Sequence, residues 1–212
     1  MTGLVSLSVS DFSAALASDA PVPGGGSAAA AAGASGAALL SMVVRLTLGK
    51  EKYRASWQDL EPLEGRIAGA RVRLLELVDE DTRAFDAVMA ARRLPKDTPE
   101  AAARRARALD EANLLAATVP MQTAFFSLEA LKNAPGVLEK GNPNTASDAW
   151  VAALLLFSAA LGALANVRIN LPGVSSPELS RGFRDDAGDL EEKAAEAFAK
   201  ARALAKARGL VG

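Results

Sequence analysis

The stretch APVPGGGSAAAAAGASGAALLSMVV, residues 20–44, carries no charged side chain and decides the fold. Its three consecutive glycines, residues 24–26, are costly to order because glycine loses more backbone freedom on folding than any other residue. A folded chain therefore keeps such a run where the backbone bends sharply or approaches another group closely. Ser27 is a favoured N-cap residue, and the alanines after it are strong helix formers. The pattern predicts a glycine loop that opens onto a helix over residues 27–48, with Gly49 at its end.

A glycine loop before a helix N-terminus suits an anion, because free N–H groups and the positive end of the helix dipole meet there. The sequence therefore predicts a place for a carboxylate or phosphate, with a plain loop and helix start as the alternative. The spacing is neither a Walker loop nor a dinucleotide fingerprint, and no strand precedes it.

A second uncharged segment covers residues 149–167 and predicts a helix over residues 147–170. Both segments have the length of about 20 residues that a membrane span needs. Their richness in Ala, Gly and Ser favours instead two central helices buried on all sides of a soluble bundle. No membrane association is expected.

The rest of the chain shows helical periodicity and no convincing strand. Further helices are predicted over residues 11–17 after Ser10, from 97 or 98 to 133, and over 177–208. A long helix that ends near 92 is also predicted, with Pro62 either in its first turn or at a kink. Short loops join them, as in antiparallel bundles. The expected fold is an all-α antiparallel helical bundle formed by one domain, residues 1–212.

The composition of the chain excludes several kinds of function and catalytic group. The 212 residues hold 24 basic and 25 acidic side chains, so nothing indicates nucleic-acid binding. The chain has no cysteine, which excludes disulfides and thiolate nucleophiles and fits a cytoplasmic protein. It has no histidine either, so acid–base chemistry falls to Asp, Glu, Lys or Tyr. No metal site and no targeting segment are predicted.

Asp81 stands out within the long helix. Leu74, Val78, Phe85 and Val88 follow a helical apolar rhythm, and Asp81 falls on the same stripe. A carboxylate there is costly unless it is paired or hydrogen-bonded. Two interpretations remain open: a structural partner for a backbone group or arginine, or a carboxyl with a raised pKa that faces a cleft.

Other polar residues gather at the ends of the two uncharged helices. Asp148 lies in a first helical turn, where the helix dipole favours a carboxylate in any case. Asn166 and Asn170 are four residues apart and share a helix face. Lys50 and Lys52 follow a helix C-terminus. Together these residues suit a site that binds a carboxylate-bearing ligand and moves protons with Asp.

Several segments occur in a specific order along nearly the whole chain. They are SDAPVPGGGS at 18–27, LTLGK at 46–50 with Lys52 and Tyr53, Asp81 with Phe85, LPK at 94–96, EKGN at 139–142, Asn144 with SD at 147–148, and Asn166 with Asn170. This order resembles the cyclodeaminase/cyclohydrolase family of folate one-carbon enzymes. The resemblance implies a helical bundle that forms a homodimer and acts on a tetrahydrofolate derivative, without a metal or redox cofactor.

The resemblance also implies roles for individual residues. Asp148 is the leading acid/base, and Asp81 is a second carboxyl or an orienting group. The implied substrate-binding residues are Pro23, Gly24, Gly25, Gly26, Ser27, Lys50, Lys52, Lys140, Asn142, Asn144, Asn166 and Asn170. Among them, Asn144, Asn166 and Asn170 are expected to position the pterin or the leaving group. The glycine loop and the lysines are expected to hold the glutamate tail.

Two reactions at the bridge between N5 and N10 of tetrahydrofolate are compatible with the resemblance. A cyclohydrolase hydrolyses 5,10-methenyltetrahydrofolate to 10-formyltetrahydrofolate, and a cyclodeaminase closes 5-formiminotetrahydrofolate with loss of ammonia. No formiminotransferase segment accompanies the motifs, so the cyclohydrolase is expected. A folate-binding helical dimer without turnover is the non-enzymatic alternative.

Overall fold

The computed structural model describes residues 3–212, and within that range every regular element is a helix. The α-helices are α1 (Val9–Leu16), α2 (Gly25–Leu48), α3 (Trp57–Arg92), α4 (Pro99–Leu131), α5 (Ala134–Lys140), α6 (Ala146–Asn170) and α7 (Pro177–Ala207). Short 3-10 turns cover Leu4–Ser6, Glu51–Ser56, Pro143–Thr145 and Leu171–Gly173. The predicted all-helical bundle is confirmed.

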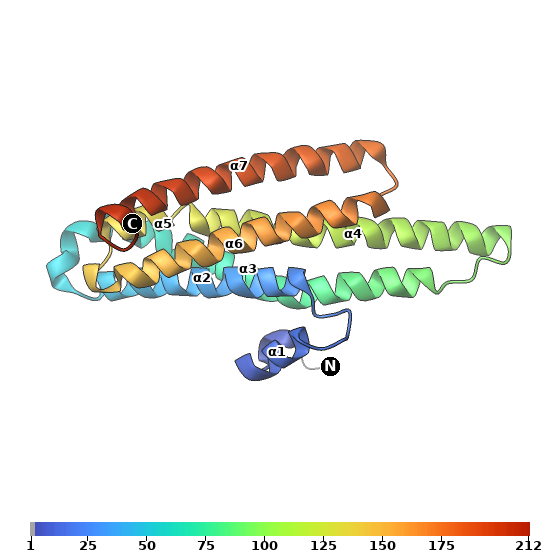
Figure 1. Ribbon diagram of the computed structural model, residues 1–212, viewed down its shortest axis with the longest axis horizontal. Helices are drawn as coiled ribbons and strands as arrows, with labels where there is room; N and C mark the ends of the chain where they lie inside the picture. Colours follow the sequence, from blue (N-terminus) through green and yellow to red (C-terminus); the bar gives the residue numbers. More distant parts are fainter. Residues whose placement is uncertain (1–2) are drawn as a thin grey trace.

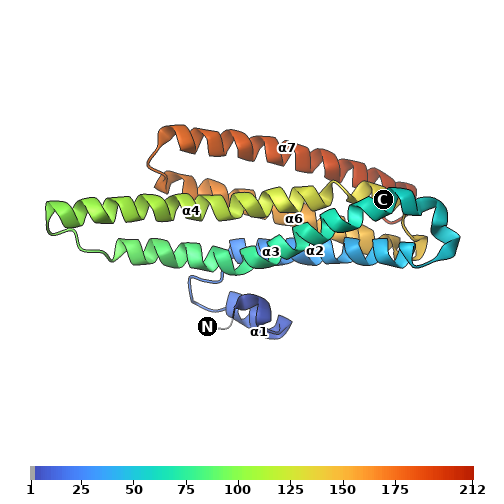
Figure 2. The same cartoon turned by 180° about the vertical axis from the view of Figure 1, so that it is seen from behind.

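The helices form an elongated bundle in which α2, α3, α4 and α6 pack side by side in a ring (Figure 1). α2 packs against α6 on one side and α3 on another, while α4 lies against α3 and α6. α7 covers the outer side of α6 and α4. Seen from behind, α3 and α4 lie side by side and extend beyond the rest of the bundle (Figure 2).

Small residues bring α2 and α6 close together. A Cβ atom on Gly36 would lie 2.8 Å from Cγ of Leu156 and 3.0 Å from the carbonyl oxygen of Ala152. A Cβ atom on Gly33 would lie 2.8 Å from Oγ of Ser127 on α4. The two helices run antiparallel, so the N-terminal end of α2 lies beside the C-terminal end of α6.

Three boundaries differ from the sequence-based expectation. α1 begins after Ser8, whose hydroxyl accepts from the backbone N–H of Asp11, rather than after Ser10. α2 begins at Gly25, so Ser27 lies inside the first turn and is not the N-cap. The chain between 134 and 140, expected as the end of a helix followed by a loop, forms α5.

The expectation that both uncharged helices are buried on all sides is wrong. α2 and α6 leave a common side uncovered, on which Val151 and Leu154 are 44% and 40% exposed. Three helical segments, within 25–48, 99–140 and 143–173, are long and apolar enough to cross a membrane by length and composition alone. Between 44% and 61% of each apolar window is buried inside the protein.

The close contact at Gly36 predicts a specific sensitivity. Gly36→Ala forces a methyl group against Leu156 and the backbone of Ala152, so we expect the free energy of unfolding to fall by about 1–3 kcal/mol. Gly69→Ala is the matched control, because nothing lies within 4 Å of a Cβ atom there and alanine favours the helix by up to about 1 kcal/mol. Urea denaturation of both variants checks the opposite signs. Equal effects would contradict the packing argument.

Candidate active site

A cavity of about 540 Å³ lies at the N-terminal end of α2, and we call it the glycine-loop pocket. It is enclosed by the glycine loop, α3, α4 and the C-terminal end of α6. Its lining residues are Pro21, Val22, Gly24, Gly25, Gly26, Asp81, Ala84, Phe85, Val88, Arg92, Asn113, Ala116, Asn166, Ile169, Asn170, Pro172 and Gly173. One carboxyl, three amides and a guanidinium therefore face a space that also has apolar walls.

Asp81 of α3 binds the first turn of α2. Its Oδ2 accepts from the backbone N–H of Ser27 at 2.9 Å and from the Ser27 hydroxyl at 3.1 Å, and that hydroxyl also donates to the carbonyl of Val78 at 2.9 Å. A Cβ atom on Gly26 would lie 2.0 Å from Oδ1 of Asp81, so the carboxyl reaches this position because residue 26 has no side chain. The anion expected at this helix N-terminus is thus, in part, the chain's own carboxylate.

The environment of Asp81 changes its proton affinity. Burial raises the pKa of this carboxyl above its ordinary value, while the hydrogen bonds from Ser27 act in the opposite direction. A carboxyl with a raised pKa takes up a proton more readily near neutral pH than a solvated aspartate does. Both interpretations of Asp81 therefore apply together, since it has a structural backbone partner and faces a cavity.

Two amides are held in fixed orientations in the pocket. Asn166 donates from Nδ2 to the carbonyl of Gly162 at 2.8 Å, and Asn170 donates from Nδ2 to the carbonyl of Ala116 at 2.7 Å. Each donation leaves the amide oxygen as an acceptor for a ligand. A Cβ atom on Gly25 would lie 3.4 Å from Nδ2 of Asn166, so the glycine loop and this amide are in close contact.

Sequence reasoning missed Asn113 and Arg92. Asn113 lies against Gly173, where a Cβ atom would be 2.8 Å from its Cγ. Leu109 and Ala116 lie on the same stripe of α4 as Asn113, so the reasoning that singled out Asp81 applies to this amide as well. No comparable signal marks Arg92, which reaches the pocket from the last turn of α3.

Pro23 lies in the glycine loop without lining the cavity, and the other predicted residues lie at the opposite end of α2 and α6. Asn142 is 2% exposed; its Oδ1 accepts from the Tyr53 hydroxyl at 2.8 Å and from the N–H of Asn144 at 3.1 Å. Its own N–H donates to Oγ1 of Thr47 at 2.9 Å. Asn142 thus orders the loop before α6, and Asp148 follows in the first turn of that helix, half-buried.

The three predicted lysines are also at this end, and all extend outward. Lys140 pairs with Asp59 at 2.5 Å, which raises the pKa of the lysine. The ammonium of Lys52 lies 4.8 Å from the ring centre of Tyr53, and Lys50 is exposed. Lys50 and Lys52 are therefore accessible to an anionic ligand, whereas the ammonium of Lys140 is engaged by Asp59.

One chain therefore holds the predicted site residues as two groups. The first is the glycine-loop pocket, and the second, which we call the Asp148 end, comprises Lys50, Lys52, Lys140, Asn142, Asn144 and Asp148. α2 has 24 residues, so the groups are separated by about 35 Å along the helix axis. Among residues 3–212, no group of three or more acidic side chains is arranged to hold a metal ion.

Comparison with known proteins places the chain in a family. The sequence profile of the family described as formiminotransferase-cyclodeaminase matches residues 8–189. The chain belongs to this family. It is 40% identical over 193 residues to a methenyltetrahydrofolate cyclohydrolase of Methylorubrum extorquens, and the match covers 88% of this chain and 93% of that protein.

Other relatives have a different activity in their names. A formimidoyltransferase-cyclodeaminase of Mus musculus is 38% identical over 168 residues, a match that covers 79% of this chain and 31% of the mouse protein. The chain thus spans about a third of that longer relative. A crystal structure of formiminotetrahydrofolate cyclodeaminase from Thermotoga maritima superposes with a TM-score of 0.82, at 27% identity over 95% of this chain and 97% of the other.

The raised pKa of Asp81 predicts a pH-dependent effect on stability. The folded protein binds the proton of this carboxyl more tightly than the unfolded chain does, so its contribution is fully present below the ordinary aspartate pKa and is lost as the pH rises through the raised value. Asp81→Asn keeps an acceptor for Ser27 and removes the titration. We therefore expect the variant to gain stability relative to the parent as the pH rises from about 4 to about 7.5.

Urea unfolding of the parent and variant at both pH values checks this sign. Asp86→Asn is the control, because Asp86 is exposed on the same helix. A difference between Asp81→Asn and the parent that is independent of pH would refute the assigned environment.

Proposed function

We propose that this chain hydrolyses 5,10-methenyltetrahydrofolate to 10-formyltetrahydrofolate. The observation that carries the proposal is the glycine-loop pocket, in which a carboxyl with a raised pKa faces a cavity together with three amides. The proposal is supported by the 40% identity to a methenyltetrahydrofolate cyclohydrolase over nearly that protein's whole length. The proposed reaction does not require a histidine.

The reaction requires one proton acceptor and one proton donor. Water adds to the electrophilic methenyl carbon and gives one proton to a carboxylate as the new C–O bond forms. The bond between that carbon and N5 then breaks, N5 receives a proton, and the hydroxyl loses its own proton as the formyl group forms on N10. One proton is released to solvent overall. Two carboxyls in different environments can perform these transfers without histidine.

The residues of the pocket suit this chemistry. Asp81 is proposed to accept or donate a proton beside the ring system of the substrate, and the free amide oxygens of Asn166 and Asn170 are proposed to orient that ring system. The apolar walls at Phe85 and Val88 suit a flat heterocycle. Asp148 is proposed as the leading acid/base and the lysines at its end as partners of the glutamate tail.

These roles require two copies of the chain. Asp148 and the glycine-loop pocket lie at opposite ends of α2 and α6, a separation of about 35 Å, longer than an extended monoglutamyl folate. We propose a homodimer in which the pocket of one protomer meets the Asp148 end of its partner. A two-fold axis that reverses the helix direction brings the two ends together twice, which makes two equivalent sites.

The cyclodeaminase reaction is the second candidate. It is favoured by the structural similarity to a formiminotetrahydrofolate cyclodeaminase and by the formimidoyltransferase-cyclodeaminases among the relatives. In this reaction N10 attacks the formimino carbon, and ammonia leaves after it is protonated. The same pair of carboxyls serves both reactions.

Two parallel assays of the purified chain separate the candidates. Loss of the near-ultraviolet absorbance of 5,10-methenyltetrahydrofolate above the spontaneous rate identifies a cyclohydrolase. Appearance of that absorbance, with ammonia, from 5-formiminotetrahydrofolate identifies a cyclodeaminase. A folded, soluble protein that binds folate without turnover in either assay would overturn both.

The cellular location, the partners and the cofactor requirement of the enzyme can also be proposed. We propose that the enzyme acts in the cytoplasm, with a folate as substrate and no nucleic acid or membrane as partner. The near-zero net charge and the cysteine-free composition support this. The proton transfers are assigned to carboxyls, so we propose that no metal or redox cofactor takes part.

Removing either carboxyl is expected to lower turnover. Asp148→Ala and Asp81→Asn each delete a proton-transfer group, so we expect kcat to fall by about 10²–10⁴-fold. Asp86→Asn, exposed on α3, is the control and keeps the parent rate. The methenyl absorbance assay measures all three, after circular dichroism has confirmed their helicity. Undiminished turnover of folded Asp148→Ala would remove this residue from the mechanism.

Mixing the two inactive variants tests the shared site. A heterodimer of Asp148→Ala and Asp81→Asn contains one site with both carboxyls intact. Co-expression in equal amounts is therefore expected to restore about a quarter of the active sites by random pairing. Tagged heterodimers, purified and assayed, provide the measurement. Activity that stays at the level of the separate variants would place both carboxyls of each site in one chain.

A further inference from the structure

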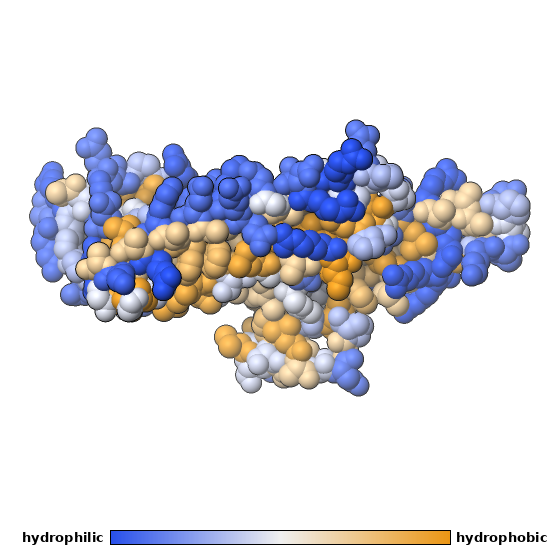
Figure 3. Space-filling view, turned by 45° about the horizontal axis from the view of Figure 1, so that its top comes forward, coloured by the Kyte–Doolittle hydropathy of each residue, from blue (hydrophilic) through white to orange (hydrophobic). Residues whose placement is uncertain are grey.

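Arg92 lines the glycine-loop pocket, but the proposed reaction gives it no role. Asp81 and Arg92 are the two charged side chains among the described lining residues of this cavity. Elsewhere charge is abundant: in the space-filling view charged side chains cover the upper side of the protein, and an apolar band runs below them (Figure 3). A guanidinium in a pocket with so few charges is suited to selecting an anionic group of the ligand.

The guanidinium of Arg92 is not used inside the protein. Within residues 3–212 the ion pairs involve other basic side chains, and Arg92 takes part in none of them. The end of α3 is capped by a different arginine, because Nε and Nη2 of Arg105 on α4 donate to the carbonyl of Arg92 at 3.3 and 3.2 Å. The exposed side chain of Arg92 is therefore available to a ligand in the pocket.

Arg92 lies on the same stripe of α3 as Asp81. Eleven residues separate the two, close to three turns of an α-helix, so both side chains leave the helix on one side. Phe85 and Val88 lie between them on this stripe and also line the pocket. The wall therefore presents a carboxyl, two apolar side chains and a guanidinium in that order, along about 16 Å of helix.

This order matches the order of groups in a monoglutamyl folate. The reacting carbon is bonded to N10, N10 to the flat p-aminobenzoyl ring, and the ring through an amide to a glutamate. Ordinary bond lengths place the α-carboxylate of that glutamate about 10 Å from N10. With a contact of about 3 Å at each end, the ligand spans about 16 Å, which agrees with the axial distance from Asp81 to Arg92.

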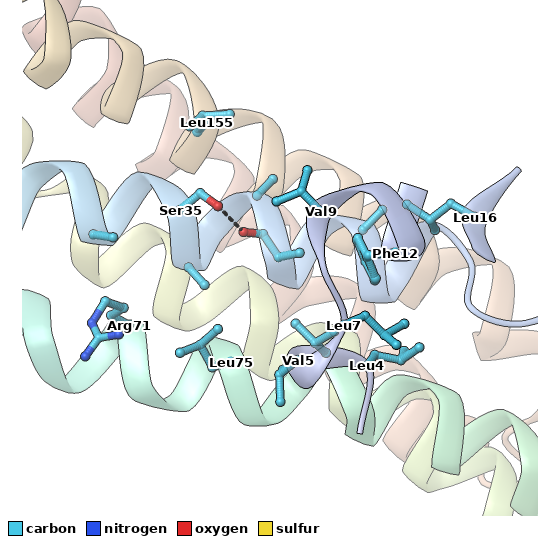
Figure 4. Close-up of a pocket in the computed structure, with 16 residues that line it drawn as sticks. Leu4, Val5, Leu7, Val9, Phe12, Leu16, Ser35, Arg71, Leu75 and Leu155 are labelled. Carbon is cyan, nitrogen blue, oxygen red and sulfur yellow. Dashed lines mark hydrogen bonds between the residues drawn. The ribbon is translucent and has the colours of Figure 1, made fainter. Parts of the chain in front are cut away.

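The second large cavity of the protein lacks these groups. It is an apolar groove of about 480 Å³ between residues 4–16 and the bundle, and Leu75 and Leu155 lie along it (Figure 4). Arg71 is the one charged side chain among its described lining residues, which include no amide and no carboxyl. A ligand with both a polar heterocycle and a carboxylate is therefore better matched by the glycine-loop pocket.

We propose that Arg92 binds the α-carboxylate of the glutamate joined to the p-aminobenzoyl ring, and that this ring packs against Phe85 and Val88. The inference rests on the proposed function, because it requires a folate in the glycine-loop pocket, and it adds a residue that selects the substrate. A planar guanidinium pairs with a carboxylate through two parallel hydrogen bonds. The γ-carboxylate, to which further glutamates are attached, remains for the lysines of the Asp148 end.

Three substrates that differ by one carboxylate test this subsite. They are 5,10-methenyltetrahydrofolate, its α-amide and its γ-amide. Arg92→Gln removes the charge, so we expect KM to rise about tenfold for the folate and for the γ-amide, which both keep the α-carboxylate. KM for the α-amide is expected to stay within about twofold of the parent's value, since the partner of Arg92 is already missing.

The turnover number and two further variants sharpen the test. The contact lies away from the reacting carbon and is the same before and during the reaction, so kcat is expected to stay near the parent's value. Arg92→Lys keeps the charge without the planar fork, and an intermediate KM is expected. Arg93→Gln is the matched control, because Arg93 is the next residue, is exposed and does not line the pocket.

Three results would overturn the subsite. The first is an unchanged KM of Arg92→Gln for the folate. The second is an equal rise in KM for the folate and the α-amide. The third is an equal rise in Arg93→Gln, which would indicate a general effect of charge. Circular dichroism confirms the helicity of each variant beforehand.

Equilibrium binding separates this inference from the proposed reaction. Calorimetric titration with 5-formyltetrahydrofolate and its α-amide measures the subsite without turnover. A preference for the folate that depends on Arg92, in a protein that turns over neither substrate, would support the subsite and overturn the reaction. Cyclohydrolase activity with an unchanged KM in Arg92→Gln would leave the reaction intact and overturn the subsite. A parent that binds neither compound and has no activity would overturn both.

Discussion

The close approach of α2 to α6 is the contact on which the rest of the structure depends. At Gly36 the backbone of α2 lies directly against Leu156 and the carbonyl of Ala152, and alanines continue the contact along both helices. Such a core gains its stability from dense packing of backbone and methyl groups rather than from aromatic rings. Because the helices are antiparallel, this contact also fixes which loops are neighbours: the glycine loop lies by Asn166, and Thr47 lies by the loop that holds Asn142.

Local sequence patterns predicted the helices well but not how the proposed site residues are arranged in space. Uncharged runs, helix-ending glycines and the apolar stripe around Asp81 depend on neighbours in the sequence, and these predictions agree with the structure. The N-cap assignment of Ser27 was wrong. The backbone N–H of Ser27 donates to the carboxylate of Asp81, 54 residues away, and no local preference reveals this contact. The separation of Asp148 from the glycine loop was equally invisible, since it follows from the antiparallel pairing of two helices that each look complete on their own.

The absence of histidine makes the environment of each carboxyl decisive. Asp81 is partly desolvated, and Gly26 admits it to the helix N-terminus, where Ser27 limits the rise in its pKa. Asp148 is only half-buried in one chain and has the ordinary stabilisation of a first helical turn. In the proposed dimer a neighbouring protomer covers it and excludes water. The two carboxyls would then differ in environment, as an acid and a base in one site must.

Tight packing and the proposed site both require that α2 is built from small, uncharged residues along most of its length. Residues without charge or bulk let one side of the helix pack tightly on α6, and in the proposed dimer its other side would meet a second copy. Charged residues are confined to the helix ends. In the proposed dimer a two-fold axis would bring the ends of both chains together. A charge in the middle of the helix would disturb the core, the dimer or both. In the proposed dimer the length of α2 would set the distance between the two sites, and the helix ends would supply their polar groups.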